Sequence, residues 1–398
     1  MSDHDILVSG GGVAGLTAAA AFGAAGFRVL VVDPAPPVTA AETPGADLRT
    51  TAFLQPARRL MERAGLWDRL APHAMELSTM RIVDAGGADG GARVTRDFLA
   101  HEVTTGPFGW NLPNWLLRRE ISARLAEMAH VTFRPGTGFA AMVAREAEVL
   151  VRLSDGTRPR VRLVVGADGR NSAVRRALGI GTTVLRYGQK AVVFAVTHDA
   201  PHGGMSTEVH RRGGPFTLVP LPDLDGRPCS SVVWMEDGPE ALRLAALSDA
   251  DFEVAATERS GWVYGPLRLA AKRQVWPIIS QIAHGLTGPR AALVAEAAHV
   301  VPPIGAQGLN MSLADITCLL DLAAARPQDL GSRAMLDAYA RRRLPEIALR
   351  VGGVDLLNRA SMAGSRPLRD LRAGGIRALH GLAPLRRSLM RLGLGARG

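Results

Sequence analysis

The sequence has little cysteine, few aromatic residues and no long uninterrupted apolar run. Its two cysteines, Cys229 and Cys318, belong to no Cys-x-x-Cys pair, so we expect neither a disulfide framework nor a zinc site. No apolar run approaches the roughly 20 residues that a membrane-spanning helix needs. The first residues, MSDHDILVSGGG, carry acids and lead directly into a strand. This start argues against a signal peptide, and the two isolated cysteines fit a reducing cytoplasm.

Motifs for nucleophilic or metal catalysis are also missing from the sequence. It has no Gly-x-Ser-x-Gly, no His-Glu-x-x-His and no cluster of cysteine and histidine. We therefore predict no metal site and no catalytic side chain that attacks a substrate. Any redox chemistry would then come from a bound cofactor, with the protein supplying position and exclusion of water.

Positive charge is concentrated at the C-terminal end. The 398 residues carry a net charge of +10, and residues 366–398 hold eight arginines and one aspartate. Leucines recur there at steps of three and four residues, which predicts basic amphipathic helices. Such a segment either lies on an anionic membrane surface or packs on the body of the protein with its arginines solvated. Basic residues interleaved with aromatics are missing, so we predict no nucleic-acid partner.

A glycine-rich turn near the N-terminus carries the first strong signal of a ligand. Residues 6–9 predict a buried strand, residues 13–25 an alanine-rich helix, and residues 28–33 a second strand ending in Asp33. Between them, Gly10, Gly12 and Gly15 form Gly-x-Gly-x-x-Gly. These glycines allow a tight turn, close approach of a pyrophosphate, and close packing of helix on strand. A helix N-terminus favours the phosphates, and Asp33 could accept hydrogen bonds from a ribose.

Two further turns of ligand-binding type follow apolar strands. One is GADGRNSAVRRALG, with Asp168, and the other is AEAAHVVPPIGAQGLN, with Glu296. Open α/β sheets bind ligands at the carboxyl ends of their strands. A nicotinamide cofactor would need the first turn only, whereas FAD is long enough to need all three. The alternative is that Asp168 and Glu296 are ordinary capping acids.

The remaining pattern predicts an α/β fold with a Rossmann-like FAD-binding domain, a β-rich substrate-domain insertion and C-terminal helices. Residues 79–98 predict a hairpin, residues 138–144, 148–153 and 160–165 three strands, and residues 311–325 and 333–351 long helices. We assign residues 1–75, 100–189 and 277–365 to the FAD-binding domain. We assign residues 76–99 and 190–276 to the β-rich substrate domain, and residues 366–398 to the basic helical segment.

The three motifs GGGVAG, GADGRNSAVRRALG and EAAHVVPPIGAQGLN together resemble those of single-component FAD-dependent aromatic hydroxylases of the para-hydroxybenzoate hydroxylase type. The resemblance covers essentially the whole chain. DLRTTA, AGLWDRLAPHA, TMRIVD and PFTLVPLP make it most similar to the ubiquinone-biosynthesis hydroxylases, which act on 2-polyprenylphenol or 6-methoxyphenol substrates.

The resemblance implies a role for each matching position. Gly10, Gly12 and Gly15 would hold the pyrophosphate of FAD, and Asp33 the adenosine ribose. The positions that would hold the rest of the cofactor are Arg49, Asn114, Asp168, Glu296, Gly308, Leu309 and Asn310. The family usually has Gly-Asp where this chain has Ala295-Glu296, and usually Glu where it has Asp33. Both changes keep a carboxylate and shift it by one methylene.

The chemistry implied is hydroxylation of a hydrophobic phenolic ring through a flavin C4a-hydroperoxide, with NAD(P)H as electron donor and O2 as oxidant. The predicted substrate is a polyprenyl phenol, because the stretch GPFTLVPLP offers no Arg and Tyr set for a benzoate. Pocket candidates are Phe216, Val219, Trp234 and Pro303, each of which could equally be plain core. His299 is expected to form a structural hydrogen bond.

Several alternatives stay open at this point. The chain could hydroxylate another small aromatic compound, or be a flavin reductase. Halogenases of this fold need a lysine, and lysine is rare here. It could also be a non-catalytic assembly factor that keeps FAD as structure. Other ubiquinone-biosynthesis proteins are candidate partners, and the cytoplasmic face of an inner membrane is a candidate location.

Overall fold

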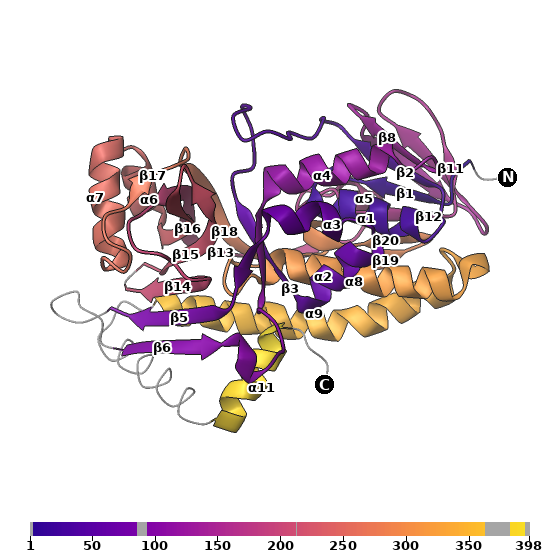
Figure 1. Ribbon diagram of the computed structural model, residues 1–398. Helices are drawn as coiled ribbons and strands as arrows, with labels where there is room; N and C mark the ends of the chain where they lie inside the picture. The colour runs from indigo at the N-terminus through magenta and orange to yellow at the C-terminus, as the bar shows by residue number, and fades with distance from the viewer. Residues whose placement is uncertain (1–2, 86–93, 212, 363–382, 395–398) are drawn as a thin grey trace.

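The computed structural model describes residues 3–85, 94–211, 213–362 and 383–394. In these residues a parallel sheet and a large antiparallel sheet are accompanied by two small sheets and by long C-terminal helices (Figure 1). This arrangement confirms the predicted α/β class with a Rossmann-like part and a β-rich insertion.

The parallel sheet has the order β19-β20-β12-β1-β2-β8, with only β19 antiparallel to its neighbour. Its inner strands are buried and apolar, as expected where helices cover both faces. In β1, which reads ILVS, every residue is buried. The strands are β1 (Ile6–Ser9), β2 (Val29–Asp33), β8 (Val131–Pro135), β12 (Leu163–Gly166), β19 (Thr287–Gly288) and β20 (Ala291–Leu293).

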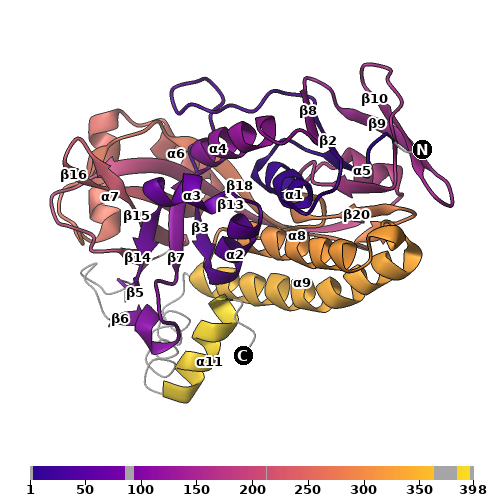
Figure 2. The same ribbon diagram turned by 45° about the vertical axis from the view of Figure 1, so that its right-hand side comes forward.

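Helices pack around this sheet, and α1 lies at their centre. Its small side chains allow α2, α4 and α8 to approach it closely. α8 and α9 run side by side beneath the sheet (Figure 2). The helices are α1 (Val13–Ala24), α2 (Gln55–Arg63), α3 (Trp67–Leu70), α4 (Asn114–Ala126), α5 (Ala173–Ala177), α8 (Gln307–Ala325) and α9 (Arg333–Met362).

The length and composition of α8 alone would let this helix cross a membrane. The helix has 19 residues with a mean hydropathy of 1.3, although no membrane-spanning run was predicted from the sequence. It lies against α1, α2 and α9, so its apolar residues belong to the core of the fold.

Two small sheets flank the parallel sheet. One contains β3 (Thr50–Leu54), β7 (Gly109–Pro113) and β4 (Met75–Leu77). The other contains β9 (Phe139–Ala144), β10 (Val149–Leu153) and β11 (Arg160–Val161). The strand predicted over residues 160–165 is therefore two strands, since β11 pairs with β10 while β12 enters the parallel sheet.

The large sheet has the order β21-β18-β13-β16-β15-β14-β5-β6, with β17 paired to β13. α6 (Gly238–Ala245) and α7 (Asp249–Ser260) belong to the same region, and Ser248 and Gly261 cap the two ends of α7. The strands are β5 (Thr79–Asp84), β6 (Val94–Leu99), β13 (Thr182–Thr197), β14 (Met205–His210), β15 (Pro215–Leu224), β16 (Arg227–Asp237), β17 (Arg268–Leu269), β18 (Gln274–Ala283) and β21 (His299–Val300).

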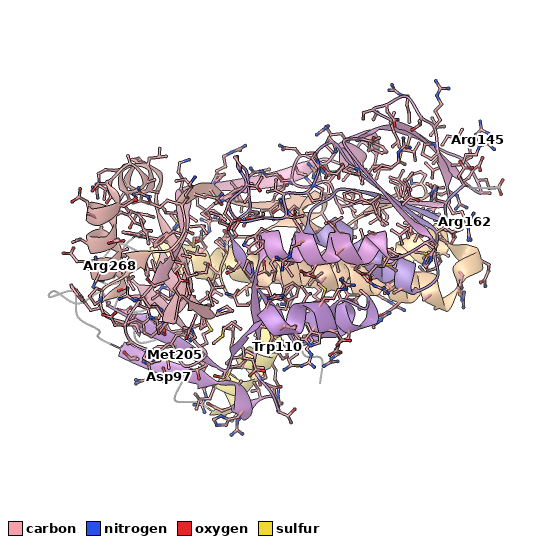
Figure 3. The ribbon with its side chains drawn as sticks, turned by 45° about the horizontal axis from the view of Figure 1, so that its top comes forward. Asp97, Trp110, Arg145, Arg162, Met205 and Arg268 are labelled. Carbon is pink, nitrogen blue, oxygen red and sulfur yellow. The ribbon has the colours of Figure 1, made fainter. Side chains whose placement is uncertain are left out.

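The β5–β6 hairpin joins this sheet through parallel pairing of β5 with β14. In Figure 3, Asp97 of β6 and Met205 of β14 mark the outer part of the sheet, and Trp110 marks β7 beside it. The two segments assigned to a substrate domain thus share one sheet. The expected boundary at residue 190 falls within β13, and the division into domains stays a prediction.

The C-terminal part follows the long helices. α8 begins at Gln307, four residues before the predicted start, and α9 continues through Pro345 to Met362. Four short 3-10 helices, η1 (Ala71–His73), η2 (Ala100–Glu102), η3 (Ala295–Ala297) and η4 (Pro327–Asp329), connect elements of the described chain. Of the basic segment, α11 (Ala383–Leu394) is described, while residues 363–382 and 395–398 lie outside the described residues.

Candidate functional site

The three predicted turns lie side by side at one edge of the parallel sheet. β20, β12 and β1 are neighbours, and the register pairs Leu293 with Gly166 and Gly166 with Ser9. Because the strands are parallel, the chain leaves all three at the same level. The turns that follow can therefore contact a single long ligand.

The three glycines of the first turn are needed for different steric reasons. A Cβ on Gly10 would lie 2.3 Å from the carbonyl oxygen of Ala167, and one on Gly15 would lie 2.0 Å from that of Gly10. These two glycines thus permit close packing of backbone on backbone. Gly12 faces open space, with nothing within 4 Å of a Cβ built there. Its position at the N-terminus of α1 leaves room for a phosphate group.

Asp33 ends β2 beside this turn. One of its carboxylate oxygens accepts a hydrogen bond from the Gly11 N–H, and the other accepts from the Ala35 N–H at 2.8 Å. A carboxylate offers about four acceptor positions, so these two bonds orient Asp33 and leave capacity for ribose hydroxyls.

A buried carboxylate, Asp47, organises the residues around Arg49. Asp47 accepts from Arg49 Nε at 2.8 Å and Nη2 at 2.7 Å, and from Asn114 Nδ2 at 3.0 Å. Burial favours protonation of Asp47, but the hydrogen bond and charge of Arg49 outweigh it and hold its pKa below the usual value. The Arg49 guanidinium also lies over the ring of Trp276, 4.3 Å from its centroid.

In the second turn, Asp168 caps the short helix α5. Its carboxylate accepts from the Ser172 hydroxyl and from the N–H groups of Ala173 at 2.7 Å and Val174 at 3.1 Å. These bonds favour the capping alternative for this acid. Arg175 connects the second turn to the third, since it donates to the carbonyl oxygens of Arg170 and Ala297.

Glu296 in the third turn is exposed, unlike the buried Ala295 and Ala297 on either side. Burial lowers the pKa of the Arg49 guanidinium, but the carboxylates of Asp47 and Glu296 raise it, and the net effect is a raised pKa. Ala295 has a φ of 56°, a left-handed conformation that favours glycine. Ala295 therefore adopts this turn at a cost in strain that a glycine would avoid.

The chain then enters α8 through Gly305 and Ala306, whose φ values are 62° and 54°. Gly308 is exposed and has nothing within 4 Å of a Cβ built on it. The side chain of Asn310 is hydrogen-bonded inside the protein and does not point to open space. Its amide accepts from the Leu54 N–H and donates to the Ala52 carbonyl oxygen, which ties α8 to β3.

A buried ion network supports the third turn from behind. Asp315 accepts from the Ala295 N–H at 3.2 Å, from His299 Nε2 at 2.7 Å and from Arg343 Nε at 2.8 Å. The His299 and Asp315 side chains are 1% and 0% exposed. His299 is thus a structural hydrogen-bonding residue, as the sequence predicted.

The four pocket candidates fall in different places. Phe216 and Trp234 lie in a core cluster with Phe252 of α7, and the Trp234 and Phe252 ring centroids are 5.9 Å apart. Strand alternation places Val219 on the opposite face of the sheet, where it is half-buried, and Pro303 is exposed. This placement favours a core role for Phe216 and Trp234.

The face of the sheet that bears Val219 meets the third turn. Val193 and Met235 form a cluster with Ile304 of that turn, and Val233 and Val301 pack against it. We call this the turn-facing face. On this face Val219 and Val233 are half-buried, and Val301 and Ile304, which flank the two prolines, pack against its cluster.

Sequence reasoning missed Asp47 and Arg343. Asp47 stands two residues before Arg49, but its partner Asn114 is far away in sequence. The role of Arg343 could have been predicted, because this arginine lies among the buried residues on one side of α9. A cation at such a position predicts a buried acid. Within the described ranges, no group of His, Cys, Asp or Glu could hold a metal ion.

The residues present fit FAD. Gly12 and Gly308 leave open space beside helix N-termini, and no described side chain caps the first turn of α1 or α8. The unpaired N–H groups there suit a pyrophosphate and the carbonyl edge of a flavin. The exposed Glu296 follows β20 at the same sheet edge and can accept hydrogen bonds from hydroxyl groups.

Comparison with known proteins decides the family. The family described as FAD binding domain matches residues 3–351. The chain belongs to this family. It is 34% identical to ubiquinone hydroxylase UbiL of Rhodospirillum rubrum, over 98% of this chain and 89% of that protein.

Two other similar proteins extend the comparison. The chain is 27% identical to 3-demethoxyubiquinol 3-hydroxylase of Escherichia coli, covering 98% of each. Its fold matches that of p-nitrophenol 4-monooxygenase PnpA from Pseudomonas putida with a TM-score of 0.79 at 20% identity, covering 99% of this chain and 98% of that one. These findings confirm the predicted family, fold class, FAD cofactor and class of enzyme, an FAD-dependent monooxygenase.

Proposed function

We propose that this member of the FAD binding domain family hydroxylates a polyprenyl phenol in ubiquinone biosynthesis. The observation that carries the proposal is that three neighbouring turns at the sheet edge fit FAD, and that the third packs through Val301 and Ile304 on the turn-facing face. The similarity to ubiquinone hydroxylases over nearly the whole chain supports the choice of substrate.

FAD, when bound, would take electrons from NAD(P)H and activate O2. The chain's own residues would hold and orient it. The N–H groups of α1, made accessible by Gly12, bind the pyrophosphate, and Asp33 binds the ribose. Glu296 accepts from the ribitol, and the first N–H groups of α8, at Gly308, Leu309 and Asn310, favour negative charge on the ring.

Arg49 and Asn114 have a positioning role in this proposal. Both are hydrogen-bonded to Asp47, which fixes the direction of the guanidinium and of the amide. Arg49 then balances the charge of Glu296 at the edge of the site. Asp168 acts through α5 and Arg175, which hold the second turn against the third.

The substrate ring lies between Pro303 and the turn-facing face, with the half-buried Val219 and Val233 as apolar neighbours. The stiff prolines at 302 and 303 exclude water from the reacting face. Such an apolar surface suits a phenol that carries a hydrocarbon tail better than it suits a charged benzoate.

Product analysis in a strain lacking the gene tests the substrate. Accumulation of an under-hydroxylated quinone precursor, reversed by the wild-type gene but not by one encoding Gly12→Ala, supports the proposal. A strain with unchanged quinone intermediates would contradict it. NAD(P)H oxidation that no phenol stimulates would instead favour a non-catalytic assembly factor.

We also propose a peripheral location at the inner membrane, since a polyprenyl tail is lipid-soluble. Arg387 and Arg391 of α11 are exposed and could meet anionic headgroups. The Arg386 guanidinium, however, pairs with Glu102 on the body of the protein. In this proposal α11 docks on the body through Arg386 and presents its exposed arginines to the membrane.

A further inference from the structure

Gln307 joins three segments of the chain at the entrance to α8. Its side-chain oxygen accepts from Arg350 Nη1 of α9 at 2.5 Å. Its amide nitrogen donates to the carbonyl oxygens of Gly305, at 2.8 Å, and of Gly393 in α11, at 3.2 Å. A primary amide has two N–H donors, so both are used. Gln307 is 9% exposed, and its orientation is fixed by these three bonds.

The bond to Gly305 stabilises an unusual piece of backbone. Gly305 and Ala306 are both left-handed, and Ala306 pays a steric cost there that a glycine would avoid. These two residues set the direction in which α8 starts. They therefore also set the direction of the N–H groups that follow, at Gly308, Leu309 and Asn310.

The bond to Gly393 connects this turn to the C-terminal helix. Arg386, near the start of α11, donates through Nε to Glu102 of η2 at 3.0 Å. Gly393 lies two turns later, about 10 Å along a helix axis. η2 directly follows β6 of the large sheet, so α11 links the sheet side of the site to the flavin-binding turn.

We propose that Gln307 is a positioning residue through which docking of α11 sets the geometry of the flavin-binding N-terminus of α8. The inference rests on the proposed function, because it assumes that these N–H groups face the flavin. It assigns the C-terminal helix a role in tuning the cofactor, beyond any contact with a membrane.

Two substitutions of Gln307 separate hydrogen bonding from charge. Gln307→Met keeps the length of the side chain and removes both donors and the acceptor. Gln307→Glu keeps the acceptor for Arg350 and removes the donors. Both should weaken FAD binding by about threefold to tenfold, as expected for loss of one or two modest hydrogen bonds. Both should also shift the midpoint potential of the bound flavin. Ser388→Ala, on the exposed side of α11, is the matched control and should leave both quantities unchanged.

The measurements are FAD titration of the apo-protein and potentiometry of the reconstituted protein, with thermal melting as a check on folding. Deletion of residues 383–398 removes only the bond to Gly393, so it should shift both quantities in the same direction as Gln307→Met and by no more. Adding the deletion to Gln307→Met should change little more. Arg386→Ala keeps the segment and loosens its other anchor, so it should shift the potential in the same direction.

A Gln307→Met protein that matches wild type in FAD affinity and potential would overturn the inference. So would a deletion whose effect simply multiplies with that of Gln307→Met. Failure of wild-type protein to bind FAD would contradict the proposed function itself, and the inference with it.

Discussion

Replacement of Asp315 by alanine gives the most quantitative prediction. The side chain of Asp315 is wholly buried and accepts hydrogen bonds from His299 and from Arg343, whose own side chain is 3% exposed. Removing the carboxylate leaves the buried guanidinium with Glu346 as its remaining acid, 2.5 Å from Nη1, and leaves His299 without its acceptor. Breaking such a buried pair costs about 3–5 kcal/mol. This is a large fraction of the roughly 5–15 kcal/mol by which a domain is stable.

Urea unfolding of the FAD-free protein, followed by circular dichroism, measures this loss, because bound FAD would add its own stabilisation. Asp321→Ala is the matched control. Asp321 pairs with Arg63 on α2, but the two side chains are 49% and 44% exposed, so the expected cost is below about 1 kcal/mol. Asp315→Asn should fall between the two, since it keeps the size and one acceptor.

Because Asp315 is ionisable, its contribution to the free energy of unfolding should depend on pH. Burial raises its pKa, but His299 and Arg343 outweigh this and hold the pKa below its usual value. The stabilisation is therefore present above about pH 4 and is lost as the pH falls through the folded-state pKa. A loss for Asp315→Ala no larger than that for Asp321→Ala would refute the reasoning. So would additive losses in the double mutant with Arg343→Met.

Four further predictions concern the glycine turn, the cofactor and the C-terminal end. Gly15→Ala should destabilise the protein by about 1–3 kcal/mol or more, because its Cβ would meet the Gly10 carbonyl oxygen at 2.0 Å. Gly12→Ala should leave the free energy of unfolding of the apo-protein almost unchanged and lower FAD affinity about tenfold or more. The added methyl group would occupy the space for the phosphates, and each hydrogen bond to them is worth about 1.5–3 kcal/mol. Glu296→Ala should weaken FAD binding by about 1–3 kcal/mol, with Glu296→Asp far milder, and equal retention of FAD by both would exclude contact with the cofactor. Co-sedimentation with vesicles should require anionic lipid, weaken in high salt and fall on removal of residues 366–398, whereas binding to neutral vesicles alone would contradict the membrane proposal.

The sequence predicted the sheet edge well because its signals are local. A buried strand, a glycine turn and a helix occupy consecutive residues from Ile6 to Ala24, and the periodicity is readable without knowledge of the rest. The start of α8 was predicted too late. Gly305 and Gly308 resemble helix breakers, yet a left-handed Ala306 lets the helix begin between them at Gln307.

The other differences come from tertiary packing. Alternation along β15 and β16 predicts two faces, but the sequence does not say which of them the α6 and α7 region covers. Phe216 and Trp234 are therefore core residues, although their strands do border the candidate site. The bonds of Asp47 to Asn114 and of Asp315 to Arg343 join segments that only the folded chain brings together.

The flavin content of the purified protein tests the central claim most directly. Protein reconstituted with excess FAD and freed of unbound cofactor should be yellow. On denaturation it should release one FAD per chain, because the three turns form a single continuous site. A folded protein that stays colourless and takes up no FAD would contradict the account.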